Sequence, residues 1–197
     1  MRRIGLTGTV ASGKSTVLAM FAERGVPVFS ADSAVHEIYS GPDAARIATE
    51  FPQAVVDGAI DRGRLSGLLA RDPAGFRDLE ALVHPLVRQK AEIFFDGAVK
   101  AGAQLAMIEI PLLYESAHDY GLDAIIVAAC DEGIWRARAL KRPGMNVEKL
   151  EQLIARQLPL AEKVKRADHV IDTGGSLSHT EAEVARVLEE LRSGTGH

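Results

Sequence analysis

Cysteine is nearly absent from this chain of 197 residues, in which Cys130 stands alone. A single thiol excludes an intramolecular disulfide framework. It also leaves too few thiol ligands for a zinc ribbon or a C-x-x-C redox pair. A reducing, cytoplasmic compartment is therefore the expected location.

The chain also lacks a surplus of basic residues and a long apolar run. It has 23 Lys and Arg against 27 Asp and Glu, a net charge of -4, so no overall basic field attracts nucleic acid or anionic lipid. No apolar run approaches the ~20 residues that span a bilayer, and Lys14 interrupts the signal-peptide-like start. We expect a soluble protein with no nucleic-acid, membrane or obligate protein partner.

Hydrophobic residues make up 47% of the chain, which is typical of a packed globular core. Short apolar runs alternate with longer helical patterns, and this order is typical of a parallel sheet with crossover helices. The expected fold is α/β, a five-stranded parallel sheet flanked by helices. The predicted strands span residues 3–7, 26–30, 105–110, 124–129 and 169–172.

Two interruptions divide this pattern. Between Val28 and Leu105 the strand signal disappears, and helices are predicted at 33–39, 44–51, 64–70 and 73–101. Residues 135–158 are predicted to form two charged helices around Pro143-Gly144, a dipeptide that breaks helices and permits a hinge. We expect a mobile lid at 135–158, a helical subdomain at 33–100, and a core formed by 1–32, 101–134 and 159–197.

The strongest motif is the octapeptide 8–15, which matches G-x-x-x-x-G-K-[ST] between a predicted strand and a predicted helix. Gly8 and Gly13 allow a tight turn whose N–H groups approach phosphate oxygens, and the helix adds its positive N-terminal end. Lys14 can reach the β- and γ-phosphates, and the Ser15 hydroxyl can ligate Mg²⁺. The alternative is a glycine-rich turn that merely begins a helix. The motif predicts an ATP and Mg²⁺ site formed by Gly8, Val10, Ala11, Ser12, Gly13, Lys14, Ser15 and Thr16.

Other classes of P-loop protein fit less well. GTPase switches usually carry an Asn-Lys-x-Asp motif, whereas Asn146, the single asparagine, is followed by Val147. Motor ATPases normally have a longer core, whereas this chain places its extra length in a helical insert and a short lid. The layout favours a small-molecule kinase. The alternative from another class is a regulatory module that holds ATP without using it.

Asp32 is the candidate general base. Ligands of open α/β sheets bind beyond the carboxyl ends of the strands, and the second predicted strand ends in Ser30-Ala31-Asp32. Asp32 could take the proton from the acceptor hydroxyl. An equally good alternative is that Asp32 is the N-cap of a helix beginning at Ser33.

The lid is rich in basic residues, and phosphoryl transfer benefits from an arginine that is brought onto the developing charge. The alternative is a solvated basic helix face. The candidates are Arg136, Arg138, Lys141 and Arg142.

Three further side chains have two interpretations each. Glu109 and Glu115 flank Pro111-Leu112-Leu113 at the end of the third predicted strand, where an acid could hold a metal-bound water, or each is a surface carboxylate. His84 precedes Pro85 within a helical pattern, and proline bends a helix. His84 therefore faces a cleft or packs at the kink.

Together these segments resemble the dephospho-coenzyme A kinase family, whose members transfer the ATP γ-phosphoryl to the ribose 3′-hydroxyl of dephospho-coenzyme A. This reaction is the last step of coenzyme A synthesis. The resemblance covers nearly the whole chain and implies a P-loop kinase fold. It rests on residues 4–15, 31–32, 57–62, 82–87, 110–115, 138, 142, 156–157 and 167–177.

The resemblance implies roles for individual residues. Asp32 would be the base, and Lys14 and Arg142 would stabilise charge. The helical region 33–100 would bind the acceptor. The acceptor residues implied are Asp32, Asp61, Arg62, His84 and Leu112, and the further ATP-binding residues implied are Arg138, Arg142 and Gly175.

The chain departs from the family pattern at a few places. Trp135 stands where the family often has glutamine, and Glu109 where it often has aspartate. Neither departure affects the reaction class. A kinase for a nucleoside monophosphate or a sugar acid is the runner-up, because it shares the loop and lid but not the 57–62 and His84-Pro85 segments.

Overall fold

The computed structural model describes residues 1–69, 72–116 and 118–194. The chain divides into two compact units, one formed by Met1–Phe29 with Phe95–His197 and the other by Ser30–Phe94. The boundaries predicted for the core, the acceptor subdomain and the lid remain a prediction. Within the described residues, no helix combines the length and apolarity needed to cross a membrane.

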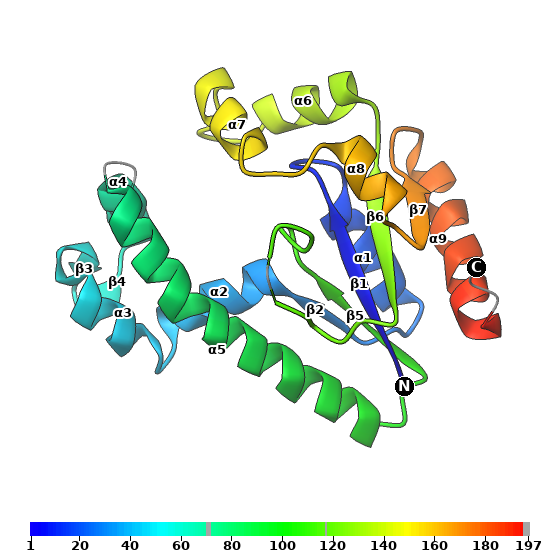
Figure 1. The fold of residues 1–197 in the computed structure, drawn as a ribbon, viewed down its shortest axis with the longest axis horizontal. Coiled ribbons are helices and arrows are strands. Elements are labelled where there is room, and N and C mark those ends of the chain that lie inside the picture. Colours follow the sequence, from blue (N-terminus) through cyan, green and yellow to red (C-terminus); the bar gives the residue numbers. More distant parts are fainter. Residues whose placement is uncertain (70–71, 117, 195–197) are drawn as a thin grey trace. The chain divides into compact units, whose positions relative to one another are not determined.

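The first unit is built on the predicted five-stranded sheet, in the order β2-β5-β1-β6-β7 (Figure 1). The neighbouring pairs β1–β5, β1–β6 and β6–β7 are parallel. Strands buried on both faces are almost continuously apolar, which is why their positions were predictable. The strands are β1 (Arg2–Gly8), β2 (Val28–Ser30), β5 (Leu105–Glu109), β6 (Ala124–Ala129) and β7 (His169–Asp172).

Two helices of this unit, α1 (Lys14–Glu23) and α9 (Leu177–Ser193), pack on the sheet and on each other. Phe21 of α1 and Val187 of α9 are fully buried in the same cluster as Ile4, Leu6 and Ile126 of the sheet. The cluster thus includes residues of β1 and of α1, on both sides of the connection between them. It therefore gives that connection a rigid support.

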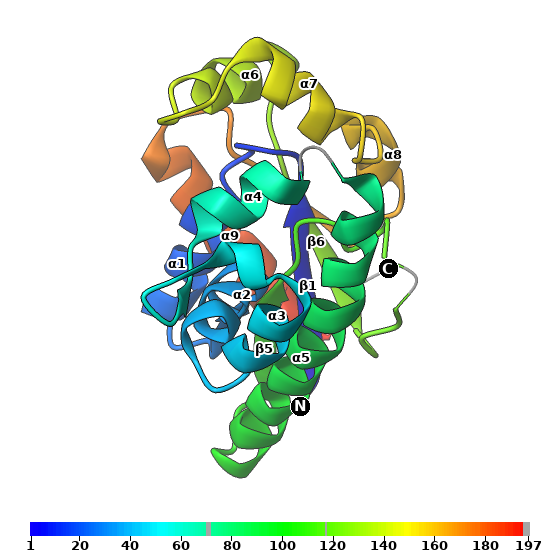
Figure 2. The same cartoon turned by 90° about the vertical axis from the view of Figure 1, so that its left-hand side faces the viewer.

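Three helices fill the segment between β6 and β7, and they follow one another in Figure 2. They are α6 (Glu132–Leu140), α7 (Val147–Ile154) and α8 (Leu160–Lys165). The α6–α7 break coincides with Pro143-Gly144, as predicted, and Asn146 caps α7 by accepting a hydrogen bond from the Lys149 N–H at 2.8 Å. The first helix begins at Glu132, slightly before the predicted lid. Trp135 is buried and packs with Val10, Ala11, Cys130, Ala139 and Leu150.

The second unit contains the predicted helices. They are α2 (Ala31–Ser40), α3 (Ala44–Glu50), α4 (Arg62–Leu69) and α5 (Pro73–Lys100), of which α5 continues past Phe94 into the first unit. Residue 70, which was predicted to end the third of these helices, lies outside the described residues. Helix α5 runs on through Pro85, and Gly102 with a positive φ of 74° follows its end.

The prediction that no strand lies between Val28 and Leu105 was wrong. After the short 3-10 helix η1 (Pro52–Ala54), β3 (Val55–Val56) and β4 (Ala59–Ile60) pair antiparallel. Asp57 and Gly58 form the turn with φ of 50° and 80°, and Asp-Gly is a favoured pair for such a hairpin turn. Two-residue strands are too short to show a period of two, so only the turn residues carried the signal.

Candidate active site

The connection between β1 and α1 forms a tight loop over residues 8–14. A Cβ on Gly8 would lie 2.4 Å from the Ala128 carbonyl oxygen and 2.6 Å from the Ser12 Oγ, so glycine is required there. Gly13 precedes α1 in the left-handed conformation, with φ of 91°, and provides no side-chain cap. The first N–H groups of α1 therefore have no capping side chain, which suits an anionic ligand.

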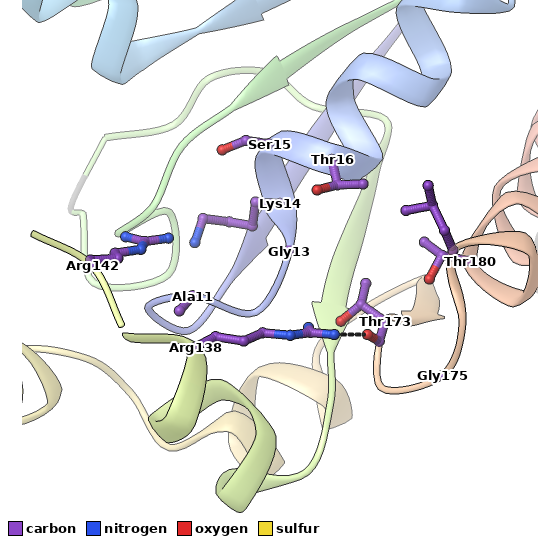
Figure 3. Close-up of a pocket in the computed structure, with 11 residues that line it drawn as sticks. Ala11, Gly13, Lys14, Ser15, Thr16, Arg138, Arg142, Thr173, Gly175 and Thr180 are labelled. Atoms are coloured by element: carbon purple, nitrogen blue, oxygen red, sulfur yellow. Dashed lines mark hydrogen bonds between the residues drawn. The ribbon is translucent and has the colours of Figure 1, made fainter. Parts of the chain in front are cut away.

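This loop borders a cavity of about 370 Å³ in the first unit (Figure 3). The lining combines loop residues, two arginines that follow β6, and residues after β7, so segments far apart in sequence meet there. The residues that line it are Ala11, Gly13, Lys14, Ser15, Thr16, Arg138, Arg142, Thr173, Gly175, Leu177 and Thr180. All but Thr173, Leu177 and Thr180 belong to the predicted ATP-binding set.

Three predicted residues of the loop lie behind its surface. Gly8, Val10 and Ser12 are not among the described residues that line the cavity, and each is buried. Their contribution is to the backbone conformation of the loop. The hydroxyls of Thr9 and Ser12 are also buried, and neither has a hydrogen-bond partner within the described part of the chain.

Lys14 extends along the loop. Its Nζ donates to the Thr9 carbonyl oxygen at 2.8 Å and to that of Gly8 at 3.4 Å. These bonds keep the ammonium over the loop, at the cavity wall. A positive charge is thereby held where phosphate oxygens would bind.

The basic residues of the lid divide into two groups. Arg138 and Arg142 line the cavity, and Arg138 donates to the Thr173 carbonyl oxygen at 2.9 Å (Figure 3). Arg136 instead pairs with Glu132 at 2.6 Å and with Glu151, and the hydrogen bonds to Glu151 and Glu132 raise the pKa of Arg136. A solvated face therefore describes only part of the cluster.

Neither Glu109 nor Glu115 is a surface carboxylate, so the surface interpretation was wrong for both. Glu109 is 3% exposed, at the end of β5 beside Leu6 in register. Glu115 is 15% exposed and pairs at 2.9 Å with the ammonium of Lys163, which is 0% exposed. Leu112, a predicted acceptor residue, is half-buried in the turn between these two carboxylates.

Sequence reasoning missed the Glu115–Lys163 pair and two hydrogen bonds to the loop. Gln157 Oε1 accepts from the Val10 N–H at 3.2 Å, and Thr173 Oγ1 donates to the Ser12 carbonyl oxygen at 2.6 Å. The periodicity of apolar and polar residues does not indicate which distant polar groups pair. Gln157 and Thr173 lie in the segments 156–157 and 167–177 that carry the family resemblance, but nothing in the sequence indicated their partners.

In the second unit, the N-cap of α2 is Ser30 and not Asp32. The Ser30 Oγ accepts from the Ser33 N–H at 3.4 Å, so Ser30 is the N-cap of α2 and the interpretation of Asp32 as the cap was wrong. Asp32 lies in the first helical turn with an exposed side chain. Its carboxylate is thus available to a ligand.

The other predicted acceptor residues of this unit lie on α4 and α5 or directly before α4. Asp61 Oδ1 accepts from the Arg64 N–H at 2.7 Å and so holds the start of α4. Arg62 lies 3.2 Å from the His36 Nδ1, which brings α2 and α4 together through a residue that was not predicted. His84 is exposed on α5, so it does not pack at the kink.

The sequence of this chain is similar to those of known kinases. A family model described as dephospho-CoA kinase matches residues 2–179. Dephospho-CoA kinase from Rhodopseudomonas palustris (strain BisB18) is 46% identical over 188 residues, which cover 95% of this chain and 94% of that protein.

Solved structures agree. TT1252 from Thermus thermophilus has a TM-score of 0.81 and 34% identity, over 96% of this chain and 97% of that chain. Dephospho-CoA kinase from Campylobacter jejuni, at 23% identity, shares the fold with a TM-score of 0.68 over 96% of this chain and 97% of that one. Because the family model and a relative at 46% identity both extend over most of its length, the chain belongs to the dephospho-CoA kinase family.

Proposed function

We propose that the protein transfers the γ-phosphoryl of ATP to the ribose 3′-hydroxyl of dephospho-CoA and so produces CoA. The observation that carries this proposal is the cavity shared by the phosphate loop, Arg138 and Arg142. Its volume of about 370 Å³ is within the range of small-molecule sites, ~300–1,000 Å³. Three cationic side chains converge on it, which suits a triphosphate.

Each cationic residue has a proposed part in the transfer. Lys14 contacts the β- and γ-phosphates, and Arg142 stabilises the charge that develops as the γ-phosphoryl moves. Arg138 and Gly175 help to hold the nucleotide. The segment 135–158 acts as a lid whose closure excludes water, a competing acceptor.

The residues present fit a magnesium ion that takes most of its ligands from the nucleotide and from water. The described residues contain no group of three or more His, Cys, Asp or Glu side chains that could hold a metal. Ser15 provides a hydroxyl at the cavity wall, and Mg²⁺ usually adds substrate phosphates and water to one or two protein ligands. When bound, the ion would neutralise charge on the β- and γ-phosphate oxygens.

Asp32 is the proposed general base. In a direct in-line transfer the 3′-oxygen bonds to the γ-phosphorus, ADP leaves, and the hydroxyl proton passes to the Asp32 carboxylate. Its exposure in the first turn of α2 supports this role. The helical region 33–100 would bind the acceptor through Asp61, Arg62 and His84, and Leu112, outside that region, would add a further contact.

We also place the protein in the cytoplasm as part of this proposal. The cytoplasm contains ATP and keeps free thiols such as that of Cys130 reduced. A net charge of -4 gives the chain no overall basic field to attract nucleic acid or anionic lipid, so we propose neither as a partner.

The test is acceptor-dependent ADP release by the purified protein with Mg²⁺ and ATP. Dephospho-CoA is offered beside a nucleoside monophosphate, gluconate, shikimate and no acceptor, and the product mass is checked. Turnover with dephospho-CoA alone, with CoA as product and its loss in Lys14→Ala, is the expected result. Turnover with another acceptor instead would overturn the substrate assignment. ATP binding without turnover on any acceptor would overturn the proposal that the protein is a kinase.

A further inference from the structure

The phosphate loop contains a residue in an unfavourable conformation. Ala11 has φ of 55°, in the left-handed region that residues with a Cβ rarely adopt. Such a conformation persists only where the surrounding structure holds it. The residues on either side of Ala11 show what holds it.

On the N-terminal side, the Val10 N–H donates to Gln157 Oε1 at 3.2 Å, across 147 residues of sequence. Val10 is only 9% exposed, and a buried backbone N–H needs a partner. On the C-terminal side, Thr173 Oγ1 donates to the Ser12 carbonyl oxygen at 2.6 Å. Ala11 therefore lies between two backbone groups that are each held by a distant side chain.

Gln157 is itself held at both ends. Its N–H donates to the Ile154 carbonyl oxygen at 2.9 Å, which joins it to the end of α7. The next residue, Leu158, donates its N–H to Glu115 Oε1 at 2.7 Å. These bonds fix the backbone from which the Gln157 side chain reaches Val10.

Glu115 is largely shielded from solvent and paired. The same Oε1 contacts Lys163 Nζ at 2.9 Å, and Lys163 is 0% exposed. Lysine is almost never fully buried unless it is paired. The Lys163 Nζ also lies 3.5 Å from the Pro111 carbonyl oxygen, so it joins the turn after β5 to α8.

We propose that Gln157 is a positioning residue for ATP. Its amide oxygen holds Val10, and thereby keeps Ala11 and the following loop N–H groups in the arrangement that receives the phosphates. Because Gln157 follows α7 at the end of the proposed lid, it also couples that segment to the loop. This inference rests on the proposed function, since it assigns the loop the task of binding ATP.

Two substitutions at Gln157 and one control test this role. Gln157→Leu keeps much of the volume and removes the acceptor, whereas Gln157→Glu keeps an acceptor oxygen. Gln152→Leu makes the same change on an exposed residue of α7. The measurements are binding of a non-hydrolysable ATP analogue by calorimetry, KM and kcat for both substrates, melting temperature, and hydrogen exchange at the Val10 amide.

Loss of a buried acceptor predicts that Gln157→Leu binds the analogue about tenfold more weakly. The KM for ATP should rise in parallel while the KM for the acceptor stays unchanged. The Val10 amide should exchange faster in Gln157→Leu, stay protected in Gln157→Glu, and match the wild type in Gln152→Leu. A general loss of stability would instead change both KM values and the melting temperature together.

The outcomes separate this inference from the proposed function. Wild-type turnover with dephospho-CoA, combined with unchanged analogue binding and Val10 exchange in Gln157→Leu, overturns the positioning role alone. Weaker analogue binding in Gln157→Leu, with no wild-type turnover on any acceptor, supports the positioning role and overturns the proposed reaction.

Discussion

At the residue scale, Ser30 and Asp32 have different surroundings although they are two positions apart. Ser30 caps α2 through its hydroxyl, whereas the Asp32 carboxylate in the first turn is exposed. Loss of a helix cap affects stability, and loss of a general base affects turnover. Substitution of each residue should therefore act on a different quantity.

We expect Asp32→Ala to lower kcat by about 10²–10⁴ with little change in melting temperature, because a general base contributes that much to a rate. Ser30→Ala should instead cost about 1 kcal/mol of stability, the usual effect of removing an N-cap side chain, and leave kcat within a few-fold. Steady-state kinetics and urea unfolding of both variants check this. Full turnover in Asp32→Ala would exclude it as the base.

Tyr114 predicts a pH effect. Its hydroxyl is buried without a hydrogen-bond partner among the described residues, and burial, aided by Asp168 and opposed by Arg166, raises the Tyr114 pKa to about 12. A raised pKa in the folded state stabilises the fold below the ordinary value of 10.0. That contribution is lost as the pH rises through the interval from 10.0 to about 12.

Tyr114→Phe should therefore lose less stability than the wild type between about pH 9 and about pH 11. Near neutral pH the variant should be at least as stable as the wild type, because it removes a buried hydroxyl for which the described residues provide no partner. Urea unfolding at both pH values measures the difference, and the comparison cancels the lysines that titrate in both proteins. Identical alkaline losses would mean that the phenol is not perturbed.

At the element scale, one arginine joins α6 to α7, and two others, on α6 and in the turn after it, line the cavity. Arg136 bridges Glu132 on its own helix and Glu151 on α7. Arg138 and Arg142 line the cavity near the loop. The positions of the four basic residues could be read from the sequence, but which arginine pairs with carboxylates and which two line the cavity could not.

Arg142→Ala should reduce kcat by about 10²–10³, the usual effect of removing one group that stabilises transition-state charge. Arg136→Ala removes the same charge from the same segment and should leave kcat within a few-fold, since its partners are Glu132 and Glu151. The ratio of the two kcat values is the decisive measurement. Equal losses would indicate a general electrostatic effect of the lid.

At the scale of the whole molecule, the Glu115–Lys163 pair connects the turn after β5 with α8 inside the first unit. Two buried charges are costly to desolvate, and removing one leaves the other unpaired. The exposed pair Lys165–Glu162 on α8 provides a matched comparison, because its side chains are 70% and 43% exposed.

Lys163→Met should therefore destabilise the protein by about 3 kcal/mol, near the lower end for a broken buried pair because Glu115 retains some exposure. Combining it with Glu115→Gln should recover much of the loss, since glutamine keeps an acceptor for the Leu158 N–H. Lys165→Met should change stability by under about 1 kcal/mol. Urea unfolding of the wild type, Lys163→Met, Glu115→Gln, the double variant and Lys165→Met tests this, and strictly additive effects of the two single substitutions would refute the coupling.

The sequence by itself determined the strands and the phosphate loop. A buried parallel strand such as β6 is a continuous apolar run, and the loop depends on consecutive residues from Gly8 to Ser15. Both signals are local, because they arise from steric limits and polarity over a few neighbouring residues. The hairpin at Asp57-Gly58 was local too, but its strands were too short to recognise by period.

Only the tertiary structure decided which distant side chains support that loop. Gln157 meets Val10, Thr173 meets Ser12, and Lys163 meets Glu115. No pattern in the chain specifies these pairs, because each depends on how the strand order and the helices after β6 bring remote segments together. Local conformation follows from neighbouring residues, whereas the partners of a buried polar group are set by the whole fold.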